Sequence, residues 1–235
     1  MLGLSTDGFR PFKHCTKTTW PIILFNYNLA PEEIFQKDNI ILMGVIPGLK
    51  KPGNCNSFLW PLVQELLQLA IGVTAFDALS KISFCLHTYL FLVFGDIPAV
   101  AMIMQMKGQN AKLPCHMCEI QGIRNNLSKT HYVPLNQDNF PSASPCQWDP
   151  SALSLCIHEM YIQQAEVVQN APTAAALDQL TTKYSIKGIP LLSSLTSFFF
   201  PSFISLWLHA SYLGQPHSQP HSPVDRKIQR FQASR

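Results

Sequence analysis

The chain has 235 residues, of which 47% are hydrophobic and 13% are charged. This composition excludes a solvated disordered protein, and the length allows one large or two small domains with a buried core. The net charge of +3 is too small to indicate nucleic-acid binding by itself. The seven cysteines are an odd number and no secretory leader is visible at the start, so we expect reduced thiols inside the cell.

The first third of the chain is typical of β-strands separated by turns. Strands are predicted over residues 2–9, 20–27 and 39–46, because apolar and β-branched residues gather there between turn residues. A helix is predicted over 57–71, where apolar residues recur at helical spacing and Pro61 falls in the first turn.

A long apolar strand is predicted over 82–94, followed by a helix from Pro98 to about residue 106. The order is then three strands, helix, strand and helix, which is the order at the start of a ribonuclease-H-like fold. In such folds one acidic residue lies on the first strand and another at the end of the fourth. Asp7 and Asp96 occupy these two places, and the predicted class is α/β.

The second half of the chain contains fewer regular elements. Residues 125–150 are loop-like, and helices are predicted over 152–168 and 171–184. We divide the chain into a partial ribonuclease-H-like core at 1–112, a Cys-x-x-Cys insertion and loop at 113–150, a helical segment at 151–192, an irregular apolar segment at 193–214 and a disordered tail at 215–235.

The apolar residues 195–213 approach the length of about 20 residues that a membrane helix needs. Several Ser and Thr residues and Pro201 argue against such a helix. We therefore expect no membrane partner, while a membrane-associated protein anchored at 195–213 stays an alternative.

The two aspartates have the chemistry of a phosphoryl-transfer site. Mg²⁺ and Mn²⁺ prefer carboxylate oxygens, and a pair of such ions activates the nucleophile and stabilises the leaving oxygen. On spacing alone, a turn at Asp7-Gly8 and a helix N-cap at Asp96 are the more typical interpretations, because both places favour Asp for ordinary reasons. Glu159 and Glu166 on the predicted helix are candidates for a third acid.

Cys115 and Cys118 have the Cys-x-x-Cys spacing of a Zn²⁺ site. Such a site needs two more ligands, and the candidates are His116, His131, Cys146, Cys156 and His158. Two thiols without a metal are the alternative, since a second Cys-x-x-Cys is missing. We assign only a packing or surface role to Cys55, Cys85 and His87.

Several short phrases along residues 2–134 are distinctive in their order and spacing. They are LSTDGFRPF (4–12), WPII (20–23), YNL (27–29), IPGLKKP (46–52), SFLWPLV (57–63), GDIPA (95–99), KGQNA (107–111), PCHMC (114–118) and HYVPL (131–135). In these phrases the chain closely resembles transposases of the CACTA (En/Spm) superfamily, especially the copies found in basidiomycete fungi. GIP (188–190) and FP (200–201) extend a weaker match to about residue 202.

The resemblance implies a DDE-type transposase core with a ribonuclease-H-like fold. Asp7 matches the first catalytic aspartate and Asp96 the second, both as ligands for Mg²⁺ or Mn²⁺. Cys115 and Cys118 match a Cys-x-x-Cys pair inserted after the second aspartate, with His131 as a further candidate ligand for Zn²⁺. The resemblance also implies DNA transposon ends as the partner, a nuclear location, a homo-oligomer and no small-molecule substrate.

The chain also departs from this pattern. The third acid of the family is expected after the Phe-Pro phrase, but no acidic residue occurs between Asp178 and Asp225. We therefore expect a truncated and catalytically inactive copy. Two alternatives stay open, namely an active nuclease that uses Glu159 or Glu166, and a DNA- or protein-binding remnant stabilised by zinc at Cys115 and Cys118.

Overall fold

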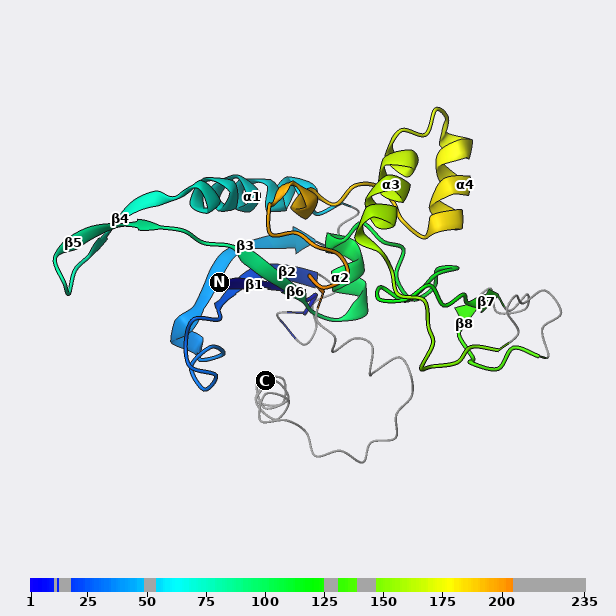
Figure 1. Ribbon diagram of the computed structural model, residues 1–235, viewed down its shortest axis with the longest axis horizontal. Helices are drawn as coiled ribbons and strands as arrows, with labels where there is room; N and C mark the ends of the chain where they lie inside the picture. The colour runs from blue at the N-terminus through cyan, green and yellow to red at the C-terminus, as the bar shows by residue number, and fades with distance from the viewer. Residues whose placement is uncertain (11, 13–17, 49–53, 125–130, 139–146, 205–235) are drawn as a thin grey trace.

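A four-stranded mixed sheet lies at the centre of the molecule (Figure 1). The computed structural model describes residues 1–10, 12, 18–48, 54–124, 131–138 and 147–204. The strands of the sheet are β1 (Leu2–Thr6), β2 (Thr18–Asn26), β3 (Ile40–Gly48) and β6 (Leu90–Phe94), in the order β3-β2-β1-β6. β1 pairs antiparallel with β2 and parallel with β6. Together with the helices, this sheet confirms the predicted α/β class.

Helix α1 (Asn56–Ile71) connects β3 to the later strands and covers the sheet. Its buried residues recur at intervals of three and four along one face, and they are Leu59, Leu62, Val63 and Leu66. They share one apolar core with Leu4 of β1 and Val93 of β6. Burial of each such side chain contributes about 1.5–3 kcal/mol to folding.

The single strand predicted over 82–94 is wrong, because the structure divides it. Residues 82–86 form β5 (Ile82–Leu86), which pairs with β4 (Val73–Asp77) in a hairpin that extends away from the sheet (Figure 1). Residues 87–89 then lead from the hairpin to β6 and pass the end of α1, where Thr88 N donates to Leu69 O. The apolar run continues across this break, and for that reason hydrophobicity alone did not reveal it.

The predicted helices are present but differ at their ends. They are α2 (Ile97–Ile103), α3 (His158–Gln169) and α4 (Ala174–Tyr184). The predicted start of α3 at residue 152 is wrong, because the preceding segment pairs with another part of the backbone. Cys156 N donates to Met117 O, and Glu119 N donates to Ser154 O. Thr173 Oγ1 accepts a hydrogen bond from Ala176 N and so fixes the start of α4.

Four short elements complete the described chain, namely the 3₁₀ turn Lys37–Asn39, β7 (Ile123–Arg124), β8 (His131–Tyr132) and the 3₁₀ turn Leu191–Ser194. The segment after that turn lies along β6, where Val93 N donates to Phe203 O at 2.7 Å. Phe200 and Ile204 are buried in the core. Within the described part of the chain, no helix is long and apolar enough to cross a membrane. The remainder of 195–213 and the tail at 215–235 lie outside the described residues.

Candidate active site

Asp7 directly follows β1, at a break in the pairing of β1 with β2. The register continues beyond the break, because Phe9 and Thr19 exchange two backbone hydrogen bonds of 2.9 and 3.0 Å. In this register Asp7 lies opposite Pro21, which has no N–H to donate to the ladder. The break therefore follows from the sequence of β2, and it leaves the Asp7 side chain exposed at the end of the strand.

Asp96 directly follows the Gly95 turn after β6 and begins α2. Its Oδ1 accepts a hydrogen bond of 2.7 Å from Ala99 N, and Pro98 lies in the first turn. The N-cap interpretation of Asp96 is therefore confirmed. It is compatible with metal binding, because a carboxylate has two oxygens and about four acceptor sites.

Two glycines allow the backbone around these aspartates to pack closely. A Cβ on Gly8 would lie 2.5 Å from the indole ring of Trp20, and a Cβ on Gly95 would lie 3.0 Å from Thr6 O. A larger residue at either position would displace a neighbouring strand or ring. Gly8 and Gly95 thus hold the two strand ends in their observed positions.

Because β1 and β6 are parallel neighbours, their carboxyl ends meet at one edge of the sheet. Asp7 and Asp96 follow these two ends, and their charges interact. Desolvation by the surrounding protein raises the pKa of Asp7, and the charge of Asp96 raises it further, while a hydrogen bond from the Gly8 backbone lowers it. Repulsion between two close carboxylates is relieved by a divalent cation, and their hard oxygens fit Mg²⁺ or Mn²⁺.

The candidate third acids lie elsewhere on the surface. Glu159 and Glu166 are both exposed on α3. This helix is joined to the core by Tyr161, whose hydroxyl donates to Met104 O at 2.5 Å. In the part of the chain that the structure describes, no three His, Cys, Asp or Glu side chains form a group that could hold a metal. The structure thus brings Asp7 and Asp96 together and adds neither glutamate to them.

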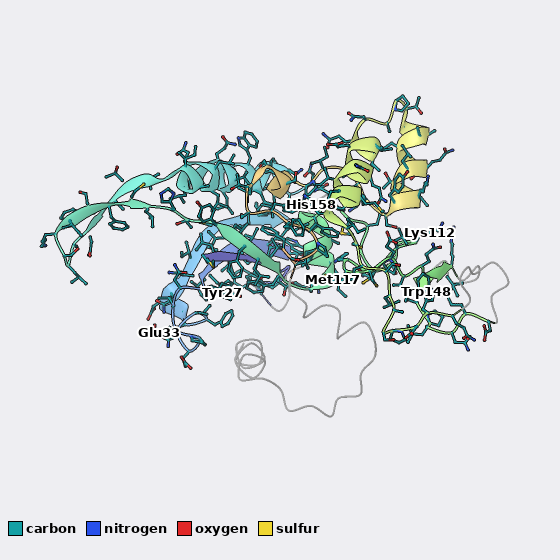
Figure 2. All side chains as sticks on the ribbon, viewed as in Figure 1. Tyr27, Glu33, Lys112, Met117, Trp148 and His158 are labelled. Carbon is teal, nitrogen blue, oxygen red and sulfur yellow. The ribbon has the colours of Figure 1, made fainter. Side chains whose placement is uncertain are left out.

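Cys115 and Cys118 are both buried at a tight turn of the 113–157 region. The backbone N–H groups of Met117 and Cys118 each donate to Cys115 Sγ at 3.3 Å. Figure 2 shows Met117 close to α2, whereas Trp148 lies further out near β7 and β8. The backbone bond from Cys156 N to Met117 O brings a third thiol to this turn.

The three cysteines line a cavity of about 50 Å³ together with Glu119 and Tyr161. Burial raises the pKa of Cys156 to about 12, and Cys115 and Glu119 add to this effect. The hydrogen bond between Cys118 and Cys115 raises the pKa of Cys118, as does burial. Without a cation the thiols of Cys118 and Cys156 stay protonated at neutral pH, so a metal would have to displace their protons.

The other candidate zinc ligands are spread along the chain. His116 is buried next to Cys115. His158 begins α3 (Figure 2). Its ring stacks on Phe199, and its Nδ1 accepts a hydrogen bond of 3.2 Å from Phe200 N. His131 lies on β8, and its role as a ligand stays a prediction. Cys146 lies outside the described residues.

Sequence reasoning missed two contributors to these sites. Pro21 fixes the break at Asp7, and the signal was available, because a proline inside a strand removes a ladder hydrogen bond. Glu119 lines the thiol cavity, but only the fold shows its proximity to Cys156.

The family model described as "Transposase family tnp2" matches residues 1–140, which is more than half of the chain. The chain therefore belongs to this transposase family. The match includes Asp7, Asp96, Cys115 and Cys118, but neither Cys156 nor the glutamates of α3. A search of the curated proteins finds no match.

Proposed function

We propose that the chain contains a DDE-type transposase core of the CACTA (En/Spm) kind, of basidiomycete type, in which Asp7 and Asp96 are metal ligands. The observation that carries the proposal is the position of the two carboxylates at the ends of the parallel neighbours β1 and β6. Membership of a transposase family makes DNA the partner to expect.

The sheet topology supports a ribonuclease-H-like core. Such a core begins with three strands and a helix, and then adds a strand beside the first one. In this chain β6 lies beside β1 in parallel orientation, after three antiparallel strands and α1. The β4–β5 hairpin is an addition between α1 and β6.

Each residue at the sheet edge would have its own role in holding a cation. A bound Mg²⁺ or Mn²⁺ would supply Lewis-acid stabilisation of the phosphate charge. Asp7 would hold the cation from the exposed end of β1. Asp96 would present its second oxygen while Oδ1 keeps the bond to Ala99 N. Gly8 and Gly95 would position both carboxylates through the close packing of their backbones.

We further propose that this chain is catalytically inactive, although it retains the carboxylate pair. The sequence has no acidic residue between Asp178 and Asp225, where the resemblance places the third ligand. Two carboxylates hold a metal pair less firmly than three, and removing one member of a cooperative catalytic group costs most of the rate.

A DNA cleavage assay tests the proposed function. The full chain is incubated with Mg²⁺ or Mn²⁺ and a supercoiled plasmid that carries the genomic DNA on both sides of its own coding sequence. We expect the plasmid to be bound without nicking. Metal-dependent nicking that is abolished in Asp96→Ala and retained in Asp178→Asn would overturn the inactive assignment and favour a complete active site. If plasmid binding is also absent, the DNA-binding part of the proposal fails.

A second candidate function is a DNA- or protein-binding module stabilised by zinc. Two N–H···S bonds to Cys115, together with the cavity that Cys115, Cys118 and Cys156 line, favour this candidate. In the described chain these thiols do not form a group of three metal ligands, so zinc would have to draw them closer together. Metal analysis of the purified chain tests it, with one zinc per chain expected and less than a tenth of that in Cys115→Ser. Zinc-free protein, folded and unchanged by Cys115→Ser, would exclude it.

A further inference from the structure

A thiol and an imidazole meet at the base of the β4–β5 hairpin. Cys85 and His87 are two residues apart, so that their side chains lie on the same side of the extended chain. The distance between Cys85 Sγ and His87 Nε2 is 3.4 Å, and both residues are exposed. Neither residue belongs to the sheet edge at Asp7 and Asp96, the carboxylate edge, or to the cavity lined by Cys115, Cys118 and Cys156, the cysteine cavity.

The end of α1 orients the imidazole. The last four carbonyls of a helix have no partner within the helix, and Ala70 O is one of them. His87 Nδ1 lies 3.2 Å from Ala70 O, and the Tyr89 hydroxyl donates to the same oxygen at 3.3 Å. Since a carbonyl only accepts, His87 Nδ1 carries the proton, and Nε2 of the neutral ring is left as an acceptor toward Cys85.

The helix end also favours the product of proton transfer. The carboxyl end of a helix carries partial negative charge, which stabilises a cation close to it. An imidazolium formed at His87 would lie at this end of α1, with its Nδ1–H on Ala70 O.

Gly72 provides the space in which the two side chains meet. It ends α1 with φ +113°, and a Cβ there would lie 2.6 Å from Cys85 Sγ and 2.7 Å from His87 Cε1. Only glycine combines this backbone conformation with such a close approach. The contact between Cys85 and His87 therefore depends on the absence of a side chain at Gly72.

We propose that Cys85 is a nucleophilic thiol, activated by His87, that undergoes exchange with small disulfides. This arrangement matches the general pattern of an activated nucleophile, in which a base accepts the proton and a third group orients the base. Exposure on the hairpin gives a small disulfide access to the sulfur, whereas Cys55, Cys115 and Cys118 are buried.

The exchange is balanced in atoms and electrons. His87 Nε2 takes the Cys85 proton, and the sulfur attacks one sulfur of the disulfide. The disulfide bond breaks as a new S–S bond forms to Cys85, and the departing thiolate takes a proton from the imidazolium. Cys85 is oxidised to a mixed disulfide, and the departing half is reduced to a thiol.

The test uses the full chain and glutathione disulfide at one neutral pH, with the modified site located by peptide mass mapping. A matched control carries an exposed thiol two residues earlier on the same strand, as Ser83→Cys combined with Cys85→Ser. We expect Cys85 to react roughly tenfold faster than this control thiol, a modest share of what a positioned base contributes in enzymes. Equal rates would overturn the proposal.

Two further variants separate base catalysis from packing. His87→Gln keeps a polar side chain but removes the base, and we expect the rate to fall to that of the control thiol. Tyr89→Phe removes the other bond to Ala70 O without changing the imidazole, and we expect the rate to be retained. An unchanged rate in His87→Gln, or equal losses in both variants with unchanged circular dichroism, would contradict the role of His87.

Discussion

The carboxylate edge and the cysteine cavity differ in how the fold positions their candidate ligands. Asp7 and Asp96 are exposed at the ends of paired strands, and their positions follow from the sheet. Cys115, Cys118 and Cys156 line a partly open cavity and come from turns whose backbones bond to one another. The carboxylate edge presents hard oxygens to solvent, and the cavity presents soft sulfurs that are buried at Cys115 and Cys118 and partly buried at Cys156.

This difference determines how strongly protonation of the side chains competes with cation binding at each place. At the sheet edge, the raised pKa of Asp7 comes from desolvation and from the nearby charge of Asp96. In the cavity, burial raises the pKa of Cys156 to about 12, so its thiol is protonated at neutral pH. A cation at the edge would mainly relieve repulsion, whereas a cation in the cavity would also have to release protons from thiols.

The largest effect is expected in the cavity if zinc occupies it. Removing zinc with a chelator should lower the free energy of unfolding by roughly 3 kcal/mol when the free metal was at a hundredfold excess over Kd. Thermal unfolding of the untreated chain and the chelated chain measures this loss. The difference should disappear in Cys115→Ser, and a chelator effect that persists in this variant would place the metal elsewhere.

The next effect concerns the packing behind the carboxylate edge. Gly8→Ala should lower the free energy of unfolding by about 1–3 kcal/mol, because the new Cβ meets the Trp20 ring. Gly44→Ala is the matched control, since a Cβ at this position on β3 has no neighbour within 4 Å, and it should change stability by less than about 0.5 kcal/mol. Urea unfolding compares the two, and equal losses would contradict the packing argument.

A smaller effect separates the two roles of Asp96. Asp96→Ala removes the cap of α2 and should cost about 1 kcal/mol, whereas Asp96→Asn keeps a capping oxygen and should cost only a few tenths. Both variants remove the charge, so both should lower the pKa of Asp7. NMR titration of the Asp7 carboxyl together with urea unfolding measures both effects. A large loss of stability in Asp96→Asn would show that the charge, rather than the cap, holds the turn.

The smallest effect is the pH dependence contributed by Asp7. A carboxyl whose pKa is raised by folding binds protons more tightly in the folded state, so stability falls as pH rises from 3.8 through the folded-state pKa. At neutral pH, Asp7→Asn should therefore be slightly more stable than the parent chain, by less than about 1 kcal/mol after solvent screening. Unfolding curves over this pH range test the direction of the stability change. A lower stability of Asp7→Asn than of the parent chain at neutral pH would contradict the prediction.

The carboxylate edge was more predictable from the sequence than the cavity. Asp7 and Asp96 each follow an apolar run and lie next to a glycine, so that strand order alone predicts their meeting. Cys156 could be named only as one of several candidate ligands, because its distance in space from Cys115 depends on how two irregular segments pair.

The β4–β5 hairpin shows a second reason why part of the fold was not predicted from the sequence. Residues 82–94 form an apolar run with few interruptions, and hydrophobicity alone predicts one strand there. What divides the run is the need of Leu69 and Ala70 at the end of α1 for hydrogen-bond donors, which residues 87–89 supply. The bond to Ala70 O also orients His87, a residue to which sequence reasoning gave only a packing or surface role.

Manganese binding to the full chain tests the central claim most directly, namely that Asp7 and Asp96 form one cation site. Electron paramagnetic resonance of free Mn²⁺ gives the affinity of the parent chain, of Asp7→Asn, of Asp96→Asn and of the exposed control Asp178→Asn. We predict that each of the first two variants weakens binding by at least about tenfold, or roughly 1.4 kcal/mol, while Asp178→Asn binds like the parent chain. Equal affinity in all four proteins would contradict the account.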